Sequence, residues 1–164
     1  MKKLLEWIRD IIIALVIAMA IMVFIKPMVV QEESMKPSFY DGDYVIVGRQ
    51  AYNLFGDIKR GDVIVFKSEL TDTNGHKKNL IKRVIALPGD TIEIKDGMVY
   101  LNGSIQDEDY IAEVGTSGEM DKKTVPSDRI FVMGDNRGVS EDSRSDRVGF
   151  VDVDSILGKV IIHF

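Results

Sequence analysis

Cysteine is missing from the 164 residues of this sequence, and histidine occurs only twice. Without cysteine the chain has no disulfide, no thiolate zinc site and no cysteine nucleophile. His76 lies in a polar segment and His163 is the penultimate residue, so neither stands where a catalytic imidazole is expected. We therefore expect no metal and no cofactor, and a base that activates a nucleophile has to be another residue type.

Positive charge is also in short supply. The chain has 21 lysine and arginine residues against 26 aspartate and glutamate residues, and its formal net charge is -5 at pH 7. A surface that binds nucleic acid needs clustered lysine and arginine, so we do not expect nucleic acid as a partner. The length allows one compact domain beside a membrane segment.

The sequence has one long apolar run. From Ile11 to Ile25 every side chain is apolar, and the run continues past Lys26 to Val30. Fifteen helical residues cover only about 22 Å, whereas twenty cover about 30 Å, the thickness of a bilayer core. The long lysine side chain can reach out of the hydrocarbon. The run therefore predicts a transmembrane anchor over residues 11–30.

The charges before the apolar run indicate its orientation. Lys2, Lys3 and Arg9 are only partly offset by two acidic residues. Because cytoplasmic flanks carry an excess of lysine and arginine, we expect residues 1–10 in the cytoplasm and residues 31–164 outside it, in a single-pass protein of the cell membrane.

A cleaved signal peptide is the alternative interpretation of the same run. A charged start, an apolar stretch and the triplet Ala18-Met19-Ala20 are compatible with it. However, the triplet lies inside the apolar run, and five more apolar residues follow. We therefore favour an anchor that is retained.

A strand pattern begins after the apolar run. A Gly-Asp pair followed by β-branched residues recurs at 42–47, 61–66 and 89–94, and each copy is typical of a turn that leads into a strand. Asp96-Gly97 is a hairpin signal. With further short apolar runs at 80–87, 129–133 and 156–162, and no amphipathic pattern after residue 30, the sequence predicts a mainly β domain of antiparallel sheets.

Two segments break this pattern. Residues 68–79 and 114–128 are polar and rich in Gly, Thr, Lys and Asp. We expect both to be surface loops.

Lys82 is the remaining candidate for a base that activates a hydroxyl. Alternation along residues 80–87 puts it on the same face as Leu80 and Val84. Burial there would lower its pKa and leave a neutral amine able to take a proton from Ser34. The alternative is an exposed lysine that protects a sheet edge, with Ser34 in a simple turn.

A third segment, residues 134–144, follows an apolar strand and is dense in small and hydrogen-bonding residues. It carries Asp135, Arg137, Asp142 and Arg144, which could form a rigid ion-paired platform. A solvated turn is the alternative.

Together these segments resemble the type I signal peptidases, membrane-anchored Ser/Lys endopeptidases that remove signal peptides from exported proteins. Ser34-Met35-Lys36-Pro37 resembles the nucleophile motif of the family. Lys82-Arg83-Val84-Ile85 with Pro88-Gly89-Asp90 resembles its lysine motif, and residues 134–144 resemble its C-terminal signature. The order of the motifs and the N-terminal anchor extend the resemblance over nearly the whole chain.

The resemblance implies a role for each residue. Ser34 is the implied nucleophile, Lys82 the general base, and Ser140 the residue that orients the lysine. Asp135, Arg137, Asp142 and Arg144 are implied to support the site.

It also implies a fold and partners. The fold is a transmembrane helix followed by a catalytic domain of coiled antiparallel sheets, to which the substrate peptide adds as a strand. The implied partners are preproteins with Ala-x-Ala before the cut, and a lipid bilayer. We expect a monomer. Two alternatives stay open: an inactive, membrane-tethered binding domain of the same fold, and a self-cleaving Ser/Lys repressor-type protease, which would need a DNA-binding domain.

Glu32 departs from the family pattern. Many members have Ser or Gly two residues before the nucleophile, and that Ser donates to the oxyanion. A carboxylate has no proton to donate and repels a developing oxyanion. We therefore expect Glu32 to point away, leaving the Ser34 backbone N–H as the main donor.

Overall fold

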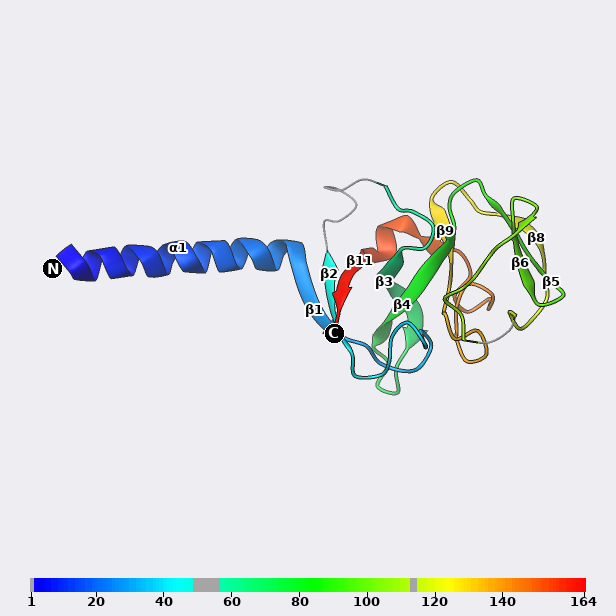
Figure 1. The fold of residues 1–164 in the computed structure, drawn as a ribbon, viewed down its shortest axis with the longest axis horizontal. Helices are drawn as coiled ribbons and strands as arrows, with labels where there is room; N and C mark the ends of the chain where they lie inside the picture. Colours follow the sequence, from blue (N-terminus) through cyan, green and yellow to red (C-terminus); the bar gives the residue numbers. More distant parts are fainter. Residues whose placement is uncertain (1, 49–56, 113–114) are drawn as a thin grey trace.

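A long N-terminal helix extends from a β-rich body (Figure 1). The computed structural model describes residues 2–48, 57–112 and 115–164. Helix α1 comprises Lys2–Phe24, and its described apolar side chains, such as Trp7 and Leu15, are exposed. None of the helices in these ranges combines the length and the hydropathy needed to cross a membrane. The transmembrane anchor stays a prediction.

The apolar segment is not one continuous helix, which differs from our interpretation of residues 11–30. Helix α1 ends at Phe24, and Ile25–Val29 form strand β1, which pairs antiparallel with β2 (Tyr44–Gly48). Pro27 explains the change, because proline disfavours helical backbone in the preceding residue and cannot donate within a helix. Strand β1 lies at the edge of its sheet, where the missing N–H of a proline is tolerated.

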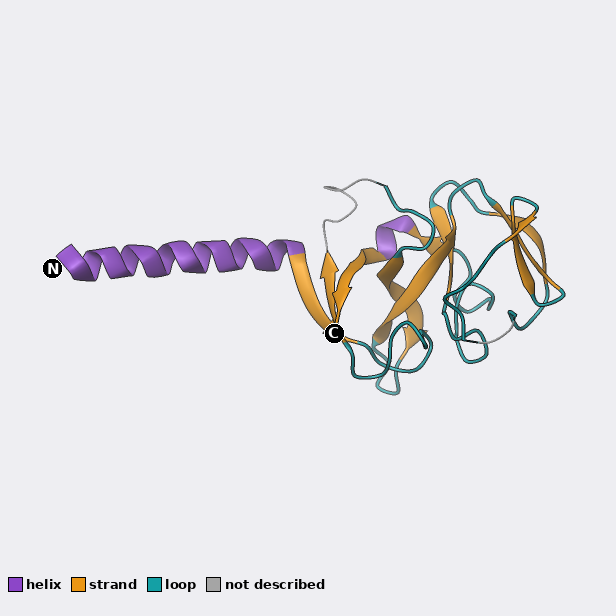
Figure 2. Ribbon diagram, in the orientation of Figure 1, coloured by secondary structure: helices purple, strands orange, loops and turns teal. Residues whose placement is uncertain are grey.

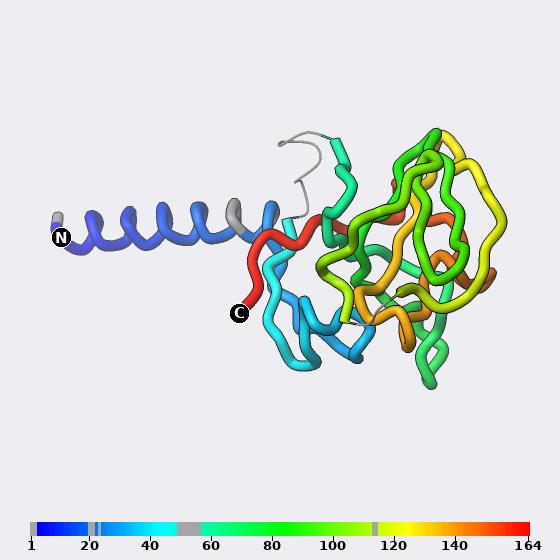
Figure 3. Tube along the Cα trace, turned by 45° about the vertical axis from the view of Figure 1, so that its right-hand side comes forward, coloured from blue at the N-terminus to red at the C-terminus, as the bar shows by residue number. Residues whose placement is uncertain are grey.

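Figure 2 shows the strands of the β-rich body in orange. The larger sheet has seven antiparallel strands in the order β1-β2-β11-β3-β4-β9-β10. The remaining strands are β3 (Val63–Thr71), β4 (Lys77–Ala86), β9 (Arg129–Met133), β10 (Val151–Asp152) and β11 (Ile156–His163), and the 3-10 helix η1 comprises Val153–Ser155. Strand β11 lies between β2 and β3, and Figure 3 shows its end returning close to the point where α1 leaves the body. Strand β4, which carries Lys82, lies between β3 and β9.

The smaller sheet has the order β7-β6-β5-β8. Its strands are β5 (Thr91–Lys95), β6 (Met98–Leu101), β7 (Ser104–Ile105) and β8 (Met120–Thr124). The hairpin between β5 and β6 turns at Asp96 and Gly97, whose φ angles are 53° and 74°. These positive values are those of the turn that Asp-Gly favours.

The mainly β, antiparallel fold is confirmed, but both loop predictions are wrong in part. Residues 68–79 contain the end of β3 and the start of β4, and residues 114–128 contain β8. Most side chains in these strand portions are exposed, so the apolar alternation that marks a half-buried strand is missing from their sequence.

The core fixes the segment that carries Ser34. Met35 is fully buried and Phe39 nearly so, and both pack in a cluster with residues of β2 and β3, including Val45 and Val65. Burying one such side chain contributes roughly 1.5–3 kcal/mol. Val30, which precedes the serine, belongs to the same cluster, so the turn after β1 is anchored to the sheet on both sides of Ser34.

Candidate active site

Ser34 lies in a short turn that hydrogen bonds hold in place. Val30 donates its N–H to the Asp43 carbonyl at 2.8 Å, and Phe39 donates its N–H to the Met35 carbonyl at 3.0 Å. The Ser34 residue is only 7% exposed. Its hydroxyl is directed at β4.

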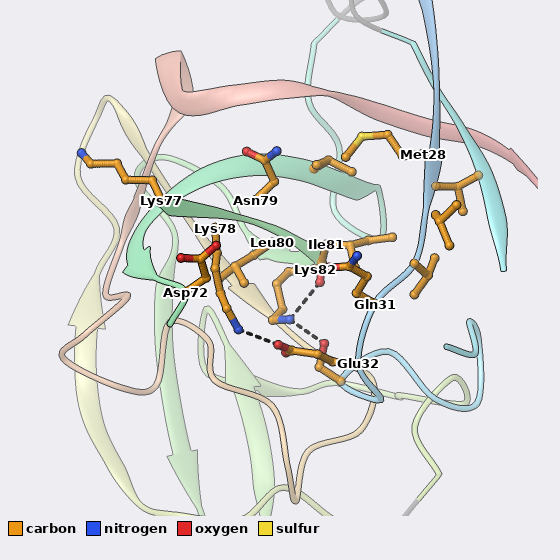
Figure 4. Close-up of a pocket in the computed structure, with 15 residues that line it drawn as sticks. Met28, Gln31, Glu32, Asp72, Lys77, Lys78, Asn79, Leu80, Ile81 and Lys82 are labelled. Atoms are coloured by element: carbon orange, nitrogen blue, oxygen red, sulfur yellow. Dashed lines mark hydrogen bonds and ion pairs between the residues drawn. The ribbon is translucent and has the colours of Figure 1, made fainter. Parts of the chain in front are cut away.

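Lys82 meets this hydroxyl from β4. Its Nζ lies 2.7 Å from Ser34 Oγ and 2.9 Å from the Ile81 carbonyl oxygen, and Figure 4 shows both contacts as dashed lines. Lys82 is 2% exposed, and Leu80 and Val84 on the same strand face are buried, as the alternation predicted. The exposed-edge alternative for Lys82 is thereby excluded.

The surroundings of Lys82 favour its neutral form. Burial lowers the pKa of Lys82 to about 8, although the negative charges of Asp142, Glu32 and Asp135 act in the opposite direction. Near pH 8 about half of the lysines are then neutral, and a neutral amine at 2.7 Å can accept the hydroxyl proton.

Asp135 supports the strand that carries the lysine. It is fully buried and binds Arg83 through two contacts, of 2.8 Å and 2.6 Å. Such bidentate pairs fix both groups in direction. The Arg83 guanidinium also lies 4.2 Å from the centre of the Tyr110 ring.

Arg137 is buried as well, but its partner is not Asp135. Its guanidinium binds both carboxylate oxygens of Glu108, at 2.8 Å and 2.6 Å, and donates to the Gly134 carbonyl at 3.0 Å and to Thr116 Oγ1. Asp135 and Arg137 therefore have different partners and do not pair with each other.

Asp142 and Arg144 form a pair of their own. Arg144 donates to the two Asp142 oxygens at 2.8 Å and 2.9 Å, and Asp142 accepts the Gly134 N–H at 3.0 Å. Arg144 also donates to the Arg137 carbonyl at 2.9 Å. The loop is thus ion-paired and hydrogen-bonded, and the solvated-turn alternative is wrong.

Sequence reasoning missed Glu108 and Tyr110. The Tyr110 hydroxyl donates to Glu108 at 2.9 Å, and burial followed by the Glu108 charge raises the pKa of Tyr110. Both residues come from a polar, irregular segment after β7, where no periodicity marks a residue as buried. The juxtaposition of Glu and Tyr with two arginines arises only from tertiary contact.

Ser140 does not contact Lys82 in the way the family resemblance implied. Its Oγ is buried and has no hydrogen-bond partner among the described residues. It packs against Gly134, where an added Cβ would lie 2.2 Å from Ser140 Oγ and 2.3 Å from the Ser34 carbonyl oxygen. The second contact of the Lys82 amine is instead the Ile81 carbonyl.

Glu32 lines the same cleft as Ser34 and Lys82, and its carboxylate binds Lys78 Nζ at 2.6 Å (Figure 4). That it points away from the developing oxyanion stays a prediction.

The cleft has a volume of about 370 Å³ and an apolar end and a polar end. The apolar end is formed by Met28, Val30, Val45, Val65 and Ile81, and the polar end by Glu32, Asp72, Lys77, Lys78 and Asn79. A smaller cleft of about 170 Å³ shares Glu32, Ser34, Lys78 and Lys82 with it. Across the described ranges, no three His, Asp or Glu side chains are grouped as a metal site requires.

A serine hydroxyl in contact with a desolvated lysine, beside a cleft, is the arrangement that Ser/Lys hydrolases use as a variant of the serine triad. The family model described as "Signal peptidase, peptidase S26" matches residues 4–164, and the chain belongs to this family.

Curated relatives and a solved structure agree with this assignment. Signal peptidase I of Bacillus licheniformis is 36% identical over 96% of this chain and 86% of its own length. Signal peptidase IB of Staphylococcus aureus is 36% identical over 99% of this chain and 90% of its own length. The crystal structure of a signal peptidase I from Enterococcus faecalis is 34% identical, covers 65% of this chain and 97% of its own, and gives a TM-score of 0.53.

The buried amine predicts a pH-dependent stability. Because the pKa of Lys82 falls from 10.5 to about 8 on folding, the unfolded chain binds more protons between these values, and stability rises with pH across this window. Lys82→Met should therefore be more stable than the parent below pH 8, by up to about 3 kcal/mol, and the difference should shrink towards pH 10.5. Urea unfolding at several pH values measures it. Lys77→Met, at a side chain 61% exposed, is the control and should show no such trend.

The close packing at Gly134 predicts a steric effect. Gly134→Ala would press against both Ser140 Oγ and the Ser34 carbonyl, and overpacking of this kind costs about 1–3 kcal/mol. Urea unfolding should show a loss of this size. Adding Ser140→Ala removes Ser140 Oγ but leaves Ser140 Cβ, at 2.6 Å, and the Ser34 carbonyl, so the double variant should recover only part of the loss. Full recovery would contradict these two remaining contacts.

Proposed function

We propose that this chain is a membrane-associated serine endopeptidase that removes signal peptides from exported preproteins, with Ser34 as nucleophile and Lys82 as general base. The observation that carries the assignment of residues is the 2.7 Å contact between Lys82 Nζ and Ser34 Oγ at a buried site beside a cleft. Membership of the signal peptidase family supports the reaction and the class of substrate.

The reaction follows from this geometry. Neutral Lys82 takes the proton of Ser34 Oγ as the oxygen attacks the carbonyl carbon of the scissile peptide bond. The lysine ammonium then protonates the leaving amine, and the signal peptide remains as an ester on Ser34. Lys82, neutral again, takes a proton from the water that hydrolyses this ester and returns it to Ser34 Oγ as the ester bond breaks, which restores both residues. The products are the free signal peptide and the mature protein.

The developing oxyanion needs a donor, and the Ser34 backbone N–H is the group we assign to it. It comes from the nucleophile itself, so it stays close to the carbonyl oxygen as the bond forms. Glu32 has no proton to donate when ionised.

The remaining residues act by keeping the Ser34 hydroxyl and the Lys82 amine in contact. Asp135 acts through Arg83, which is adjacent to Lys82, and Asp142 acts through the Gly134 N–H. Arg137 and Arg144 lock the same loop. For Ser140 we propose a role in packing Gly134 against Ser34, since its hydroxyl has no hydrogen bond to the lysine in the described residues.

The cleft suits an extended peptide. The segment after β1 forms one wall and β4 the other, and apolar side chains such as Val30 and Ile81 line the end nearest β1. A preprotein segment with small side chains, of the Ala-x-Ala type, would lie between these walls as an added strand. The reaction needs a single copy of the chain, so we expect a monomer.

Helix α1 supports an association with the bilayer. Its described apolar side chains are exposed, and it leads directly through β1 into the turn that carries Ser34. We propose that residues 11–30 anchor the chain, with 1–10 in the cytoplasm and 31–164 outside, and that the helical part of the anchor ends at Phe24. A nucleophile this near the membrane meets the scissile bond of a signal peptide inserted in the same bilayer.

Cleavage of a preprotein tests the function. Purified parent protein in detergent should cut a preprotein after Ala-x-Ala, whereas Ser34→Ala and Lys82→Met should not, although both should stay folded. The parent kcat/KM should rise with pH through about 8, because the free enzyme needs a neutral lysine. No cleavage by the folded parent would favour the inactive binding domain. Near-normal turnover by Lys82→Met would exclude this lysine as the base.

Two truncations test the anchor. Deleting residues 2–24 removes the helix but keeps β1 and its pairing with β2, so this form should leave the membrane fraction and still cut a peptide. Deleting residues 2–30 also removes the end strand of the sheet and should unfold at lower urea concentration. Retention of the first form in the membrane would contradict the proposed anchor.

A further inference from the structure

The ion pair between Glu32 and Lys78 lies in the catalytic cleft but takes no part in the reaction described above. Glu32 stands two residues before Ser34, and Lys78 stands four residues before Lys82 on β4. Their charged atoms are 2.6 Å apart. Both residues line the larger and the smaller cleft, so the pair lies where the clefts meet, beside the reacting groups (Figure 4).

The position of the Glu32 carboxylate is set from both ends. Its backbone has a φ of 72°, in the left-handed region that non-glycine residues rarely adopt, and its N–H donates to an Asp41 side-chain oxygen at 2.9 Å. Such a conformation costs on the order of 1 kcal/mol and persists only when its neighbours hold it. Lys78 holds the other end.

The other carboxylates close enough to act on Lys82 are also paired with cations. Asp142 binds Arg144 at 2.8 Å, and Asp135 binds Arg83 at 2.6 Å. Both aspartate side chains are fully buried, so their partners stay in place. Each paired cation reduces the attraction that its carboxylate exerts on a lysine ammonium.

Glu32 is also paired with a cation, but this pair is more exposed to water than the two aspartate pairs. The Glu32 side chain is 60% exposed and that of Lys78 is 37% exposed. In water an ion pair of this kind contributes only about 0–1 kcal/mol. A peptide that fills the cleft displaces this water, and charges then act more strongly on each other. The pair therefore matters most when substrate is bound.

The other charged groups that face the pair have partners of their own. Lys77 binds Glu69 at 2.7 Å, and Arg147 binds Glu141 at 3.3 Å on the smaller cleft. Asp72, at the polar end, accepts backbone N–H groups of its own hairpin, and the charge of Lys78 acts on it as well. In the described part of the chain, Lys78 is the cation that compensates Glu32.

We propose that Lys78 is a positioning residue for the Ser34–Lys82 reaction: it holds the Glu32 carboxylate in an ion pair on the cleft wall, so that the catalytic amine and the developing oxyanion face a neutral pair. This inference rests on the proposed function of Ser34 and Lys82. It also explains how the site tolerates a carboxylate where a hydrogen-bond donor to the oxyanion would be expected.

The test is a set of pH profiles for Lys78→Met, Glu32→Gln and the double variant. In Lys78→Met the uncompensated carboxylate stabilises the Lys82 ammonium, so the acidic limb of the kcat profile should move to higher pH by about one unit. The kcat/KM limb should move less, because it reports the free enzyme with its open cleft. Glu32→Gln should move the kcat limb to lower pH, and the double variant should return it towards the parent.

Lys77→Met is the matched control, since it removes a neighbouring lysine with a different partner, and its limb should stay at the parental pH. A kcat limb of Lys78→Met within about 0.2 unit of the parent would overturn the inference. The inference would also be overturned if the kcat limb of Glu32→Gln moved in the same direction as that of Lys78→Met. A third contrary result is a loss of kcat in Lys78→Met at all pH values without a shift of the limb, because that marks a merely structural role.

A second readout does not depend on turnover. In the Ser34→Ala background, the Lys82 titration can be followed by 13C NMR of the lysine side chains, and it should move upward by about 0.3 unit on Lys78→Met. Absence of cleavage by the parent would count against the proposed function, whereas absence of this shift would count against the role of Lys78.

Discussion

The burial of one lysine amine beside one serine hydroxyl is the constraint on which the rest of the site depends. An amine removed from water is stable in the fold only if its hydrogen bonds are satisfied and its charge can be lost. Here Ser34 Oγ and the Ile81 carbonyl satisfy the bonds, and the pKa falls to about 8. The strand order contributes to the burial, because β4 lies between β3 and β9 and Lys82 comes directly before the residues of β4 that pair with β9.

The surrounding ion pairs answer a second requirement. Carboxylates near the amine stabilise its charged form and so raise its pKa. The loop that follows β9 nevertheless places two aspartates, Asp135 and Asp142, near the amine. Each is bound by an arginine, one from the same loop and one from the strand of the lysine itself. The loop is therefore rigid without making the neighbouring base strongly cationic, and this combination explains why charged residues are so dense around a reaction that needs a neutral amine.

Short sequence patterns predicted those features of the fold that depend on residues close together in the chain. Alternation along residues 80–87 placed Lys82 on the face of Leu80 and Val84, which is buried, although it did not by itself decide against an exposed edge. Asp96-Gly97 was enough to place a hairpin. The end of α1 was misjudged because hydropathy continues through Pro27, where the backbone changes from helix to strand.

The partners of the buried arginines could not be predicted in the same way. Glu108 and Tyr110 come from an irregular polar segment, and only the packing of the folded chain brings them to Arg137. The same holds for Ser140 and Glu32. Their expected orientations came from a family pattern. In the structure Ser140 packs against Gly134, which has no side chain, and Glu32 binds Lys78, which lies outside the motifs.

The position of β11 sets the order in which the site can be assembled. The serine is attached to β1 and β2, the lysine belongs to β3 and β4, and the strand that joins these halves of the sheet comes after all the others in the sequence. During synthesis both reactive residues are present long before β11, but they belong to separate hairpins with a gap one strand wide between them. The larger sheet, with one reactive residue on each side of β11, is therefore complete only when the last strand of the chain has been added.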